Sequence, residues 1–400
     1  MISFKKILFF MSVLFFLTQC KTNTIQLVNP KQNSSIKWSE RMANSIMAHH
    51  PHPFQIDDKE KPKWDYVHGL VMTGFEQLYK KSNNETYFNY LKLYSDTLID
   101  EKGNIATYKL ESYNIDMVVA GNHLFYLYEV TKNSKYKIAL DKLRSQLNTH
   151  PRTSEGGFWH KKIYPNQMWL DGLYMGAPFY AQYNVRYENA SKLNDIALQF
   201  ELIQKHLYDS KTGLLFHGWD ESKQMAWANP QTGCSPNFWS RSLGWYAMAL
   251  VDVLDFFPEN HTKRQELITY FSELCNNLLR FQHASGMWHQ VTDQGERDGN
   301  YLETSATAMF SYAFAKGANK GYLNNIFKSH AHKAFDGIIN NQVKMSPEGH
   351  VILTNCCAVA GLGGTPFRDG SFEYYINEKK KDNDPKATGP FILAALELNR

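Results

Sequence analysis

The chain has 400 residues, of which 43% are hydrophobic and 20% are charged, and this ordinary composition excludes a disordered protein. Its net charge is only +4, and apart from Lys379 to Lys381 the basic residues do not cluster, so nucleic acid is not an expected partner. Aromatic residues make up 14% of the chain. Tryptophan and tyrosine rings beside hydrogen-bonding groups suit sugar rings, so the composition permits a carbohydrate-binding protein.

The first 20 residues have the layout of a bacterial secretory signal. Two lysines precede an apolar run over residues 7–17 that is too short to span a membrane. The tetrapeptide LTQC that follows resembles a lipobox, in which Cys20 would be lipidated and become the first mature residue. We therefore expect a lipoprotein signal over 1–20, a polar tether over 21–36 and a lipid-anchored protein in the cell envelope of a bacterium.

Helical patterns follow one another from about Trp38 to the end of the chain. Strand alternation is scarce, with short candidates at 213–219 and 287–291. The twelve expected helices cover about 37–49, 65–82, 84–99, 114–131, 134–148, 165–186, 189–206, 236–257, 262–281, 300–316, 325–340 and 388–398.

The connections between these helices are of two kinds. Short links, as at 80–84 and 130–134, join a helix to its partner, and longer links rich in Gly and Trp lead to the next pair. Twelve helices in six hairpins can close into a ring. The sequence therefore predicts an all-α fold, an (α/α)6 barrel or six-hairpin toroid, as one domain over 37–400. An open helical solenoid is the alternative, but no fixed repeat period is visible.

One carboxylate, Asp171, lies in an aromatic, glycine-rich segment over 156–183. Pro165 suits the first position of a helix, which places Asp171 on the face that belongs to the core. Ionised carboxylates are rarely buried without partners, so this face should meet a polar network or a cavity. Gly172 and Gly176, one turn apart, favour a cavity. A core aspartate satisfied by nearby backbone is the alternative.

A second acid, Asp116, falls in the first turn of the helix expected over 114–131, where the helix dipole favours its ionised form. If the inner helices of a ring share one direction, their N-termini open onto one mouth, and Asp116 and Asp171 can face each other across a pocket. Paired carboxylates in unlike surroundings are typical of glycosidic chemistry. Asp171, ringed by apolar groups, is expected to retain its proton near neutral pH. A first-turn acid without a catalytic role is the alternative for Asp116.

Two histidines, His160 and His217, end the similar segments GGFWH and GLLFH, each of which lies on a long link between helices. We expect both to donate or accept hydrogen bonds with a substrate. The regular ligand spacing that a metal needs is absent, so we expect neither a metal nor a cofactor. The cysteines beyond the signal show no CxxC spacing and are expected to be buried thiols. They are Cys234, Cys275, Cys356 and Cys357.

In the helix expected over 236–257, Arg241 and Trp245 are four residues apart and share a face. A guanidinium matches a carboxylate through two parallel hydrogen bonds, and an indole can stack on a sugar ring, so this pair suits an acidic sugar. Trp239 is expected to lean over the mouth from the start of the helix. A structural cation–π pair beside a local acid is the alternative.

These segments resemble glycoside hydrolase family 105, the unsaturated rhamnogalacturonyl hydrolases. The resemblance covers about residues 110–400 and rests on WLDGLYM, HGWD, SRSLGWY, NYLETSATAMF and DGSFEYY. It implies an (α/α)6 barrel acting on oligosaccharides whose non-reducing end is a 4,5-unsaturated uronic acid left by a polysaccharide lyase. It also implies that Asp171 is the general acid/base and Asp116 its partner carboxylate. The implied substrate-binding residues are His160, His217, Trp239, Arg241 and Trp245.

The implied reaction is hydration of a vinyl ether. Asp171 would protonate C4 and then take a proton from the water that adds at C5, after which the hemiketal opens and the glycosidic link breaks. Arg241 would hold the C6 carboxylate. The alternatives are an unsaturated glucuronyl hydrolase acting on other uronate polysaccharide fragments and a non-catalytic glycan-binding surface lipoprotein. We expect a monomer that meets the membrane only through its lipid anchor.

Overall fold

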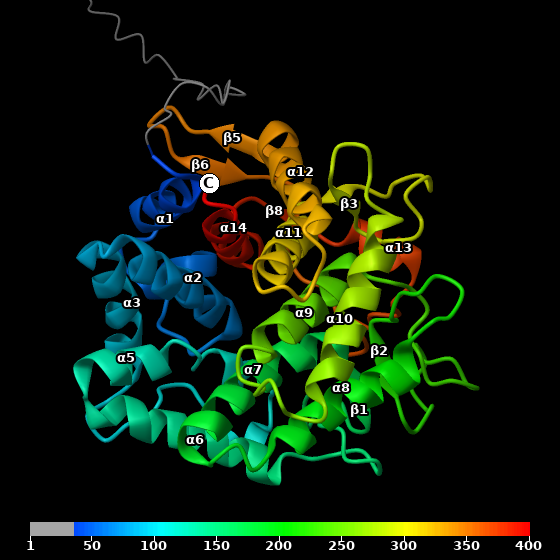
Figure 1. Ribbon diagram of the computed structural model, residues 1–400, viewed down its shortest axis with the longest axis horizontal. Coiled ribbons are helices and arrows are strands. Elements are labelled where there is room, and N and C mark those ends of the chain that lie inside the picture. Colours follow the sequence, from blue (N-terminus) through cyan, green and yellow to red (C-terminus); the bar gives the residue numbers. More distant parts are fainter. Residues whose placement is uncertain (1–35) are drawn as a thin grey trace, which may run out of the picture.

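Six inner helical segments form a closed ring (Figure 1). The computed structural model describes residues 36–400, so the predicted signal, the lipidation of Cys20 and nearly all of the tether lie outside the described residues. Neighbouring inner helices contact each other around the ring, and the last contacts the first. In order they are α2 (Tyr66–Ser82), α4 (Asp116–Val119) continued by α5 (Leu124–Thr131), α7 (Leu170–Tyr187), α9 (Ser240–Val253), α11 (Thr304–Asn319) and α14 (Pro385–Glu397).

A second layer of helices covers the ring, and each outer helix packs against an inner one (Figure 1). The first outer helix packs on α14, and the backbone N–H of Ser39 donates to the carbonyl of Arg400 at 3.4 Å, which joins the two ends of the described chain. The predicted (α/α)6 barrel is therefore confirmed. The outer helices are α1 (Trp38–His49), α3 (Glu85–Leu98), α6 (Ser134–Thr149), α8 (Leu193–Leu207), α10 (Arg264–Leu279) and α12 (Ile326–Gln342).

The two layers differ in burial, as their sequences do. On the inner helix α11 every residue over 304–318 is buried. On the outer helix α10 the buried residues are Leu267, Phe271, Leu274, Cys275 and Leu278, which form a single stripe at helical spacing. Among residues 36–400 the four expected buried thiols are indeed free and buried. No helix within the same range is both long and apolar enough to cross a membrane.

A tight turn with a left-handed glycine follows five of the outer helices. The glycines have φ between 68° and 97°, a region that side chains with a Cβ rarely adopt. At one of them, Gly286, a Cβ would lie 2.2 Å from the carbonyl oxygen of Lys333, so no side chain fits. The turns are a structural repeat of unequal spacing, which explains why no fixed period is visible in the sequence. The five glycines are Gly103, Gly156, Gly213, Gly286 and Gly349.

Two predicted helix starts are wrong because the residues before each helix form hydrogen bonds with distant parts of the chain. Helix α7 begins at Leu170 and not at Pro165, since β1 (Gln167–Trp169) pairs with β2 (Gly218–Asp220). Helix α9 begins at Ser240 and not at 236, since Ser235 exchanges backbone and side-chain hydrogen bonds with Gly218 at 2.9 and 3.1 Å. Both segments are held by pairing with distant residues, which outweighs the local preference for a helix.

Other boundaries also differ from the prediction. The helix expected over 114–131 is divided into α4 and α5, because residues 120–123 form tighter turns in which N–H groups donate three residues back. Helix α11 begins at Thr304 after the strand β4 (Leu302–Glu303), and α14 begins at Pro385. The strand candidates are confirmed only in part, as β2 and as β3 (Trp288–His289), which pairs with β4. The sequence analysis missed β5 (Val343–Met345), β6 (Val351–Leu353), β7 (Cys356–Cys357), β8 (Lys380–Lys381), the 3₁₀ turns Pro53–Asp58 and Leu110–Ser112, and α13 (Phe372–Asn377).

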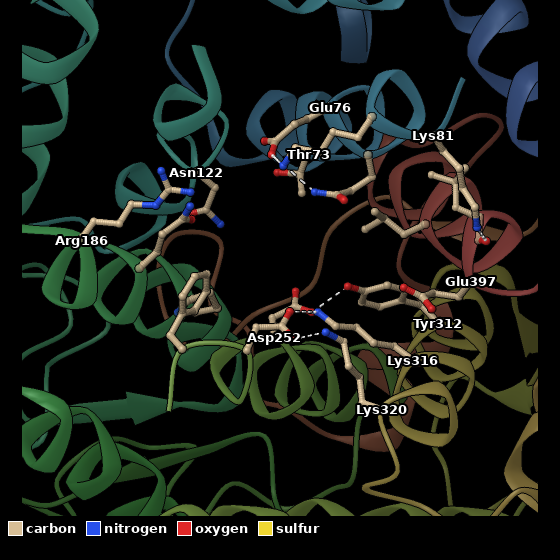
Figure 2. Close-up of a pocket in the computed structure, with 18 residues that line it drawn as sticks. Thr73, Glu76, Lys81, Asn122, Arg186, Asp252, Tyr312, Lys316, Lys320 and Glu397 are labelled. Atoms are coloured by element: carbon tan, nitrogen blue, oxygen red, sulfur yellow. Dashed lines mark hydrogen bonds and ion pairs between the residues drawn. The ribbon is translucent and has the colours of Figure 1, made fainter. Parts of the chain in front are cut away.

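A cavity of about 560 Å³ lies at one end of the ring, among the C-terminal turns of the inner helices (Figure 2). Lys316 lies between Asp252 and Asp255, with its Nζ 2.7 and 2.6 Å from their carboxylate oxygens, and Lys80 pairs with Glu76. Cations in these positions offset the negative ends of the helix dipoles. These two lysines are thus paired with carboxylates of the same wall. None of the sequence-predicted site residues lines this cavity.

Two buried histidines should make the fold sensitive to acid. Burial lowers the pKa of His123 to about 3 and that of His150 to about 4, whereas the ordinary value is 6.5. Both therefore bind a proton more readily in the unfolded chain, so their contribution to stability is complete above pH 6.5 and is lost as the pH falls below it. We expect each to lower the free energy of unfolding by about 2 kcal/mol between pH 7.5 and 5.

Urea unfolding at the two pH values measures this loss in the wild type and in His123→Asn. The variant should be less stable at pH 7.5, since Nε2 of His123 contacts the Ser95 hydroxyl at 2.8 Å, but it should lose about 2 kcal/mol less on acidification. An equal loss in both proteins would show that His123 is not responsible.

Candidate active site

The N-terminal ends of the inner helices meet at one mouth of the ring. Asp116 is the first residue of α4, and Asp171 and Arg241 are the second residues of α7 and α9. Burial, above all, raises the pKa of the Tyr66 hydroxyl at the start of α2, and the charges of Arg241 and Asp116 also act on it. Side chains from distant parts of the chain therefore share one electrostatic environment. The sequence analysis missed Tyr66, which lies where the first inner helix begins.

Asp171 faces His217. The distance from Oδ2 of Asp171 to Nε2 of His217 is 3.1 Å, but the angle does not make a hydrogen bond, and neither atom has another partner among the described residues. His217 is fully buried, and its carbonyl accepts from the N–H of Leu170 at 3.0 Å, which ties its loop to the start of α7. Within residues 36–400, no lysine or arginine pairs with Asp171. This carboxyl group is therefore open to a ligand on one side.

Asp116 has different surroundings. Its Oδ2 lies 2.6 Å from Nζ of Lys161, and its Oδ1 lies 3.3 Å from Nε2 of His160. Burial and the charge of Lys161 hold the pKa of His160 well below its ordinary value, so this imidazole is neutral. Asp116 and its hydrogen bond raise the pKa of Lys161, although burial opposes this rise. Asp116 is thus paired with a lysine. Lys161 was missed, although it directly follows His160 in the sequence.

Gly172 and Gly176 line a pocket, as expected, but this pocket is small. A Cβ on Gly176 would lie 2.8 Å from Cδ1 of Ile115, and one on Gly172 would lie 3.1 Å from Nδ1 of His160. The side of α7 that carries these glycines leaves a void of only about 20 Å³. The glycines also let His160 and the start of α4 approach α7, which brings the two acid–histidine pairs together.

Aromatic rings surround the two histidines. Trp169 stacks on His160 with ring centroids 4.3 Å apart, and it stacks on Tyr164 at 5.0 Å on its other side. Trp239 lies against His217 at 4.9 Å. Trp245 lies one turn deeper on α9, is buried, and stacks on Tyr174 at 4.9 Å. Trp239 therefore packs against His217, whereas contact between Trp245 and a substrate stays a prediction.

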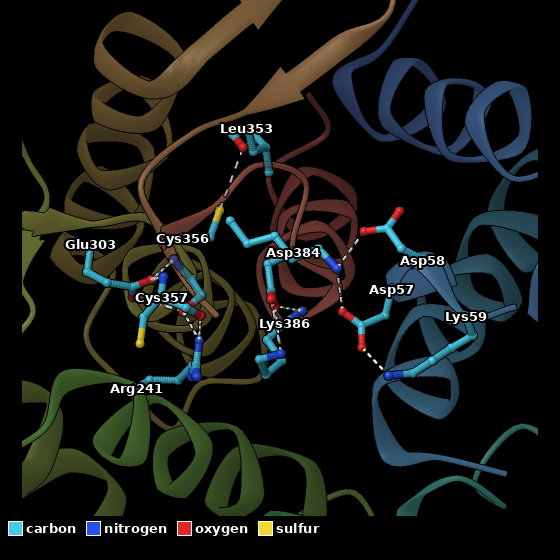
Figure 3. Close-up of polar contacts among 12 residues, drawn as sticks. Asp57, Asp58, Lys59, Arg241, Glu303, Leu353, Cys356, Cys357, Asp384 and Lys386 are labelled. Carbon is cyan, nitrogen blue, oxygen red and sulfur yellow. Dashed lines mark hydrogen bonds and ion pairs between the residues drawn. The ribbon is translucent and has the colours of Figure 1, made fainter. Parts of the chain in front are cut away.

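Arg241 is a buried cation without a carboxylate in contact (Figure 3). Its side chain is 1% exposed, and its guanidinium lies over the ring of Trp239, 4.8 Å from the centroid. Its Nη1 donates to the carbonyl of Cys357 and lies 3.4 Å from the hydroxyl of Ser305. Among the described residues its Nε has no hydrogen-bond partner, and no carboxylate lies within 4.0 Å of it. The cation–π partner is thus Trp239, and no local acid completes the pair.

Glu303, a buried acid whose charge acts on this cation, already accepts hydrogen bonds from the backbone. Glu303 accepts a hydrogen bond from the N–H of Cys357 at 2.9 Å (Figure 3). It also accepts from the N–H groups of Ser305 and Ala306 at 3.1 and 2.7 Å. Burial alone would lower the pKa of Arg241, but Cys357 and Glu303 raise it above its ordinary value, so the charge is permanent. A buried, permanent cation with an unpaired N–H is suited to an anionic ligand.

The comparisons with known proteins place these residues in a family context. The sequence profile described as Glycosyl Hydrolase Family 88 matches residues 38–400. A solved glycoside hydrolase of family 105 from C. acetobutylicum has 45% sequence identity and a TM-score of 0.87, with 91% of this chain and 99% of that chain covered.

Two curated relatives are also similar. Protein Atu3128 of Agrobacterium fabrum is 36% identical over 229 residues, which are 56% of this chain and 97% of that protein. The unsaturated rhamnogalacturonyl hydrolase YesR of Bacillus subtilis is 28% identical over 272 residues, which are 66% of this chain and 74% of YesR.

Proposed function

We propose that this chain, a glycosidase that belongs to Glycosyl Hydrolase Family 88 and is similar to family 105 enzymes, acts on oligosaccharides made by a polysaccharide lyase. It would remove a 4,5-unsaturated uronic acid from their non-reducing end. The observation that carries the proposal is the difference between its two acids. Asp116 is paired with Lys161 at 2.6 Å, whereas the only basic side chain within 4.0 Å of Asp171 among residues 36–400 is the imidazole of His217. Two carboxyl groups in unlike surroundings can take the separate roles of proton donor and fixed anion.

In the proposed reaction, protonated Asp171 delivers its proton to C4 of the double bond. The positive charge that forms at C5 is shared with the ring oxygen. Water adds at C5 and gives a proton back to Asp171, which regenerates the acid. The hemiketal then opens to a ketone at C5, which leaves a hemiacetal at C1, and collapse of this hemiacetal to an aldehyde releases the next sugar. Asp116, held as an anion by Lys161 and next to His160, orders the water and supports Asp171. Proton transfer by one positioned group contributes about 10²–10⁴-fold.

The proposed substrate class is rhamnogalacturonan fragments. Arg241 supports an acidic terminal sugar, because its buried guanidinium has no carboxylate in contact within the described chain. The similarity to YesR supports rhamnose as the following sugar, since that relative is an unsaturated rhamnogalacturonyl hydrolase. The upstream reaction is then an elimination by a polysaccharide lyase, which is the chemistry that creates a 4,5 double bond.

The test follows the ultraviolet absorbance of the conjugated double bond. We expect the absorbance of a rhamnogalacturonan lyase digest to decay when the protein is added, because hydration removes the conjugation. Lyase digests of other uronate polysaccharides, with glucuronate-containing fragments among them, are run in parallel at equal absorbance. Faster decay on those fragments would contradict the rhamnogalacturonan assignment. Binding of a digest with no decay would contradict hydrolysis altogether and would indicate a glycan-binding protein.

A further inference from the structure

Tyr375 lies directly behind His217. Its hydroxyl oxygen is 2.8 Å from Nδ1 of His217, and both residues have no exposed surface. Tyr375 belongs to the short helix α13, and its ring stacks on Trp239 with centroids 5.7 Å apart. Its carbonyl accepts from Nε2 of Gln290 at 3.1 Å. The ring and the backbone of Tyr375 are thus both held, so its hydroxyl has a defined position against the imidazole.

The direction of this hydrogen bond decides which nitrogen of His217 carries the proton. Burial raises the pKa of Tyr375 well above its ordinary value, so the hydroxyl keeps its hydrogen. Within residues 36–400, Nδ1 of His217 is its one hydrogen-bond partner. If Tyr375 donates to Nδ1, the proton of the neutral imidazole lies on Nε2, 3.1 Å from Oδ2 of Asp171. In the other tautomer Nδ1–H would donate to the hydroxyl oxygen, and the buried hydroxyl hydrogen of Tyr375 would have no acceptor among the described residues.

We propose that Tyr375 is a positioning residue that fixes His217 in the tautomer with the proton on Nε2. This inference rests on the proposed function, because it concerns how the negative charge on Asp171 is stabilised during the proposed reaction. After Asp171 has given its proton to C4 it is a carboxylate, and the Nε2–H group beside it stabilises that charge until water returns a proton. Since Nε2 and Oδ2 have no other partner among the described residues, the same N–H can also donate to a substrate oxygen placed next to them.

Tyr375→Phe tests the proposal, because it keeps the ring and its stacking and removes only the hydroxyl. We expect kcat to fall roughly tenfold, the effect of losing one buried hydrogen bond, while KM changes less than about threefold. The matched control is Tyr374→Phe. The neighbouring hydroxyl accepts from the N–H of Gly361 at 3.0 Å and forms no hydrogen bond with His217, so its removal should not produce this split between kcat and KM.

The tautomer itself is measured without substrate, by nitrogen-15 NMR of the protein labelled in its 15 histidines. The signals of His217 are identified by their loss in His217→Gln. In the wild type and in Tyr374→Phe, Nε2 should have the shift of a protonated nitrogen and Nδ1 that of a bare one, and Tyr375→Phe should move both shifts toward a mixture. A wild-type Nδ1–H pattern, or an unchanged pattern in Tyr375→Phe, would overturn the proposal. Because this measurement needs no turnover, it stays decisive even if the proposed substrate is wrong.

Discussion

Asp171→Asn is expected to lower kcat by at least about 100-fold on an unsaturated disaccharide, the low end of general acid/base contributions. Asparagine keeps the shape of the side chain but cannot deliver a proton to C4 or accept one from water. The fold should survive, because among the described residues Oδ2 of Asp171 makes no hydrogen bond. Substrate affinity should change little, because asparagine keeps the size of the side chain and one carbonyl acceptor. The decay of the double-bond absorbance under saturating substrate gives kcat.

The matched control makes the same chemical change on the outer layer. Asp336 lies on α12, where it pairs with Arg400 at the surface, and Asp336→Asn should retain wild-type kcat. Circular dichroism and thermal unfolding confirm that both variants are folded. A folded Asp171→Asn protein with more than about a hundredth of the wild-type kcat would show that another group delivers the proton.

Arg241→Ala is expected to raise KM roughly 10- to 100-fold and to change kcat only a few-fold. The guanidinium is buried, and among the described residues it has no carboxylate within 4.0 Å, so the carboxylate of the substrate would be its first anionic partner. Charge-assisted hydrogen bonds are worth about 1.5–3 kcal/mol. A contact made equally in the bound substrate and in the transition state affects KM and not kcat.

A methyl ester of the unsaturated uronate separates the loss of this contact from general damage. The wild type should bind the ester as weakly as Arg241→Ala binds the acid, and the variant should bind both alike. Because Nη1 also holds the carbonyl of Cys357, thermal unfolding is measured alongside. If the variant still preferred the acid over the ester, or if kcat collapsed while KM stayed unchanged, Arg241 would not hold the carboxylate.

Most of the architecture could be predicted because buried apolar residues recur at helical spacing along the sequence. The buried stripe on α10 is visible as apolar spacing in the sequence, and short links identify which helices pair. Helix starts were predicted less well. Residues 167–169 pair with 218–220, and a local pattern contains no information about a partner about fifty residues away.

In the candidate site, too, some features could be predicted from local sequence and others depend on distant partners. Asp171, Asp116, His160 and His217 could be selected from the sequence because charged or polar side chains next to glycines and aromatic rings are unusual in a helical core. The contacts that give these residues different roles could not be predicted from the sequence. Lys161 had no visible reason to be more than a surface lysine, and Tyr375 is 158 residues from His217 in the sequence.

The sequence by itself determined the helical layers, the position of the acids at helix starts and the resemblance to family 105, because each depends on residue type and on spacing within a few turns. Only the tertiary structure decided that Asp116 is balanced by Lys161 while Asp171 faces an imidazole backed by Tyr375. The physical reason is that closing the ring brings loops from different hairpins to one mouth. The charge and hydrogen-bond partners of each acid depend on that closure, and local periodicity has no part in it.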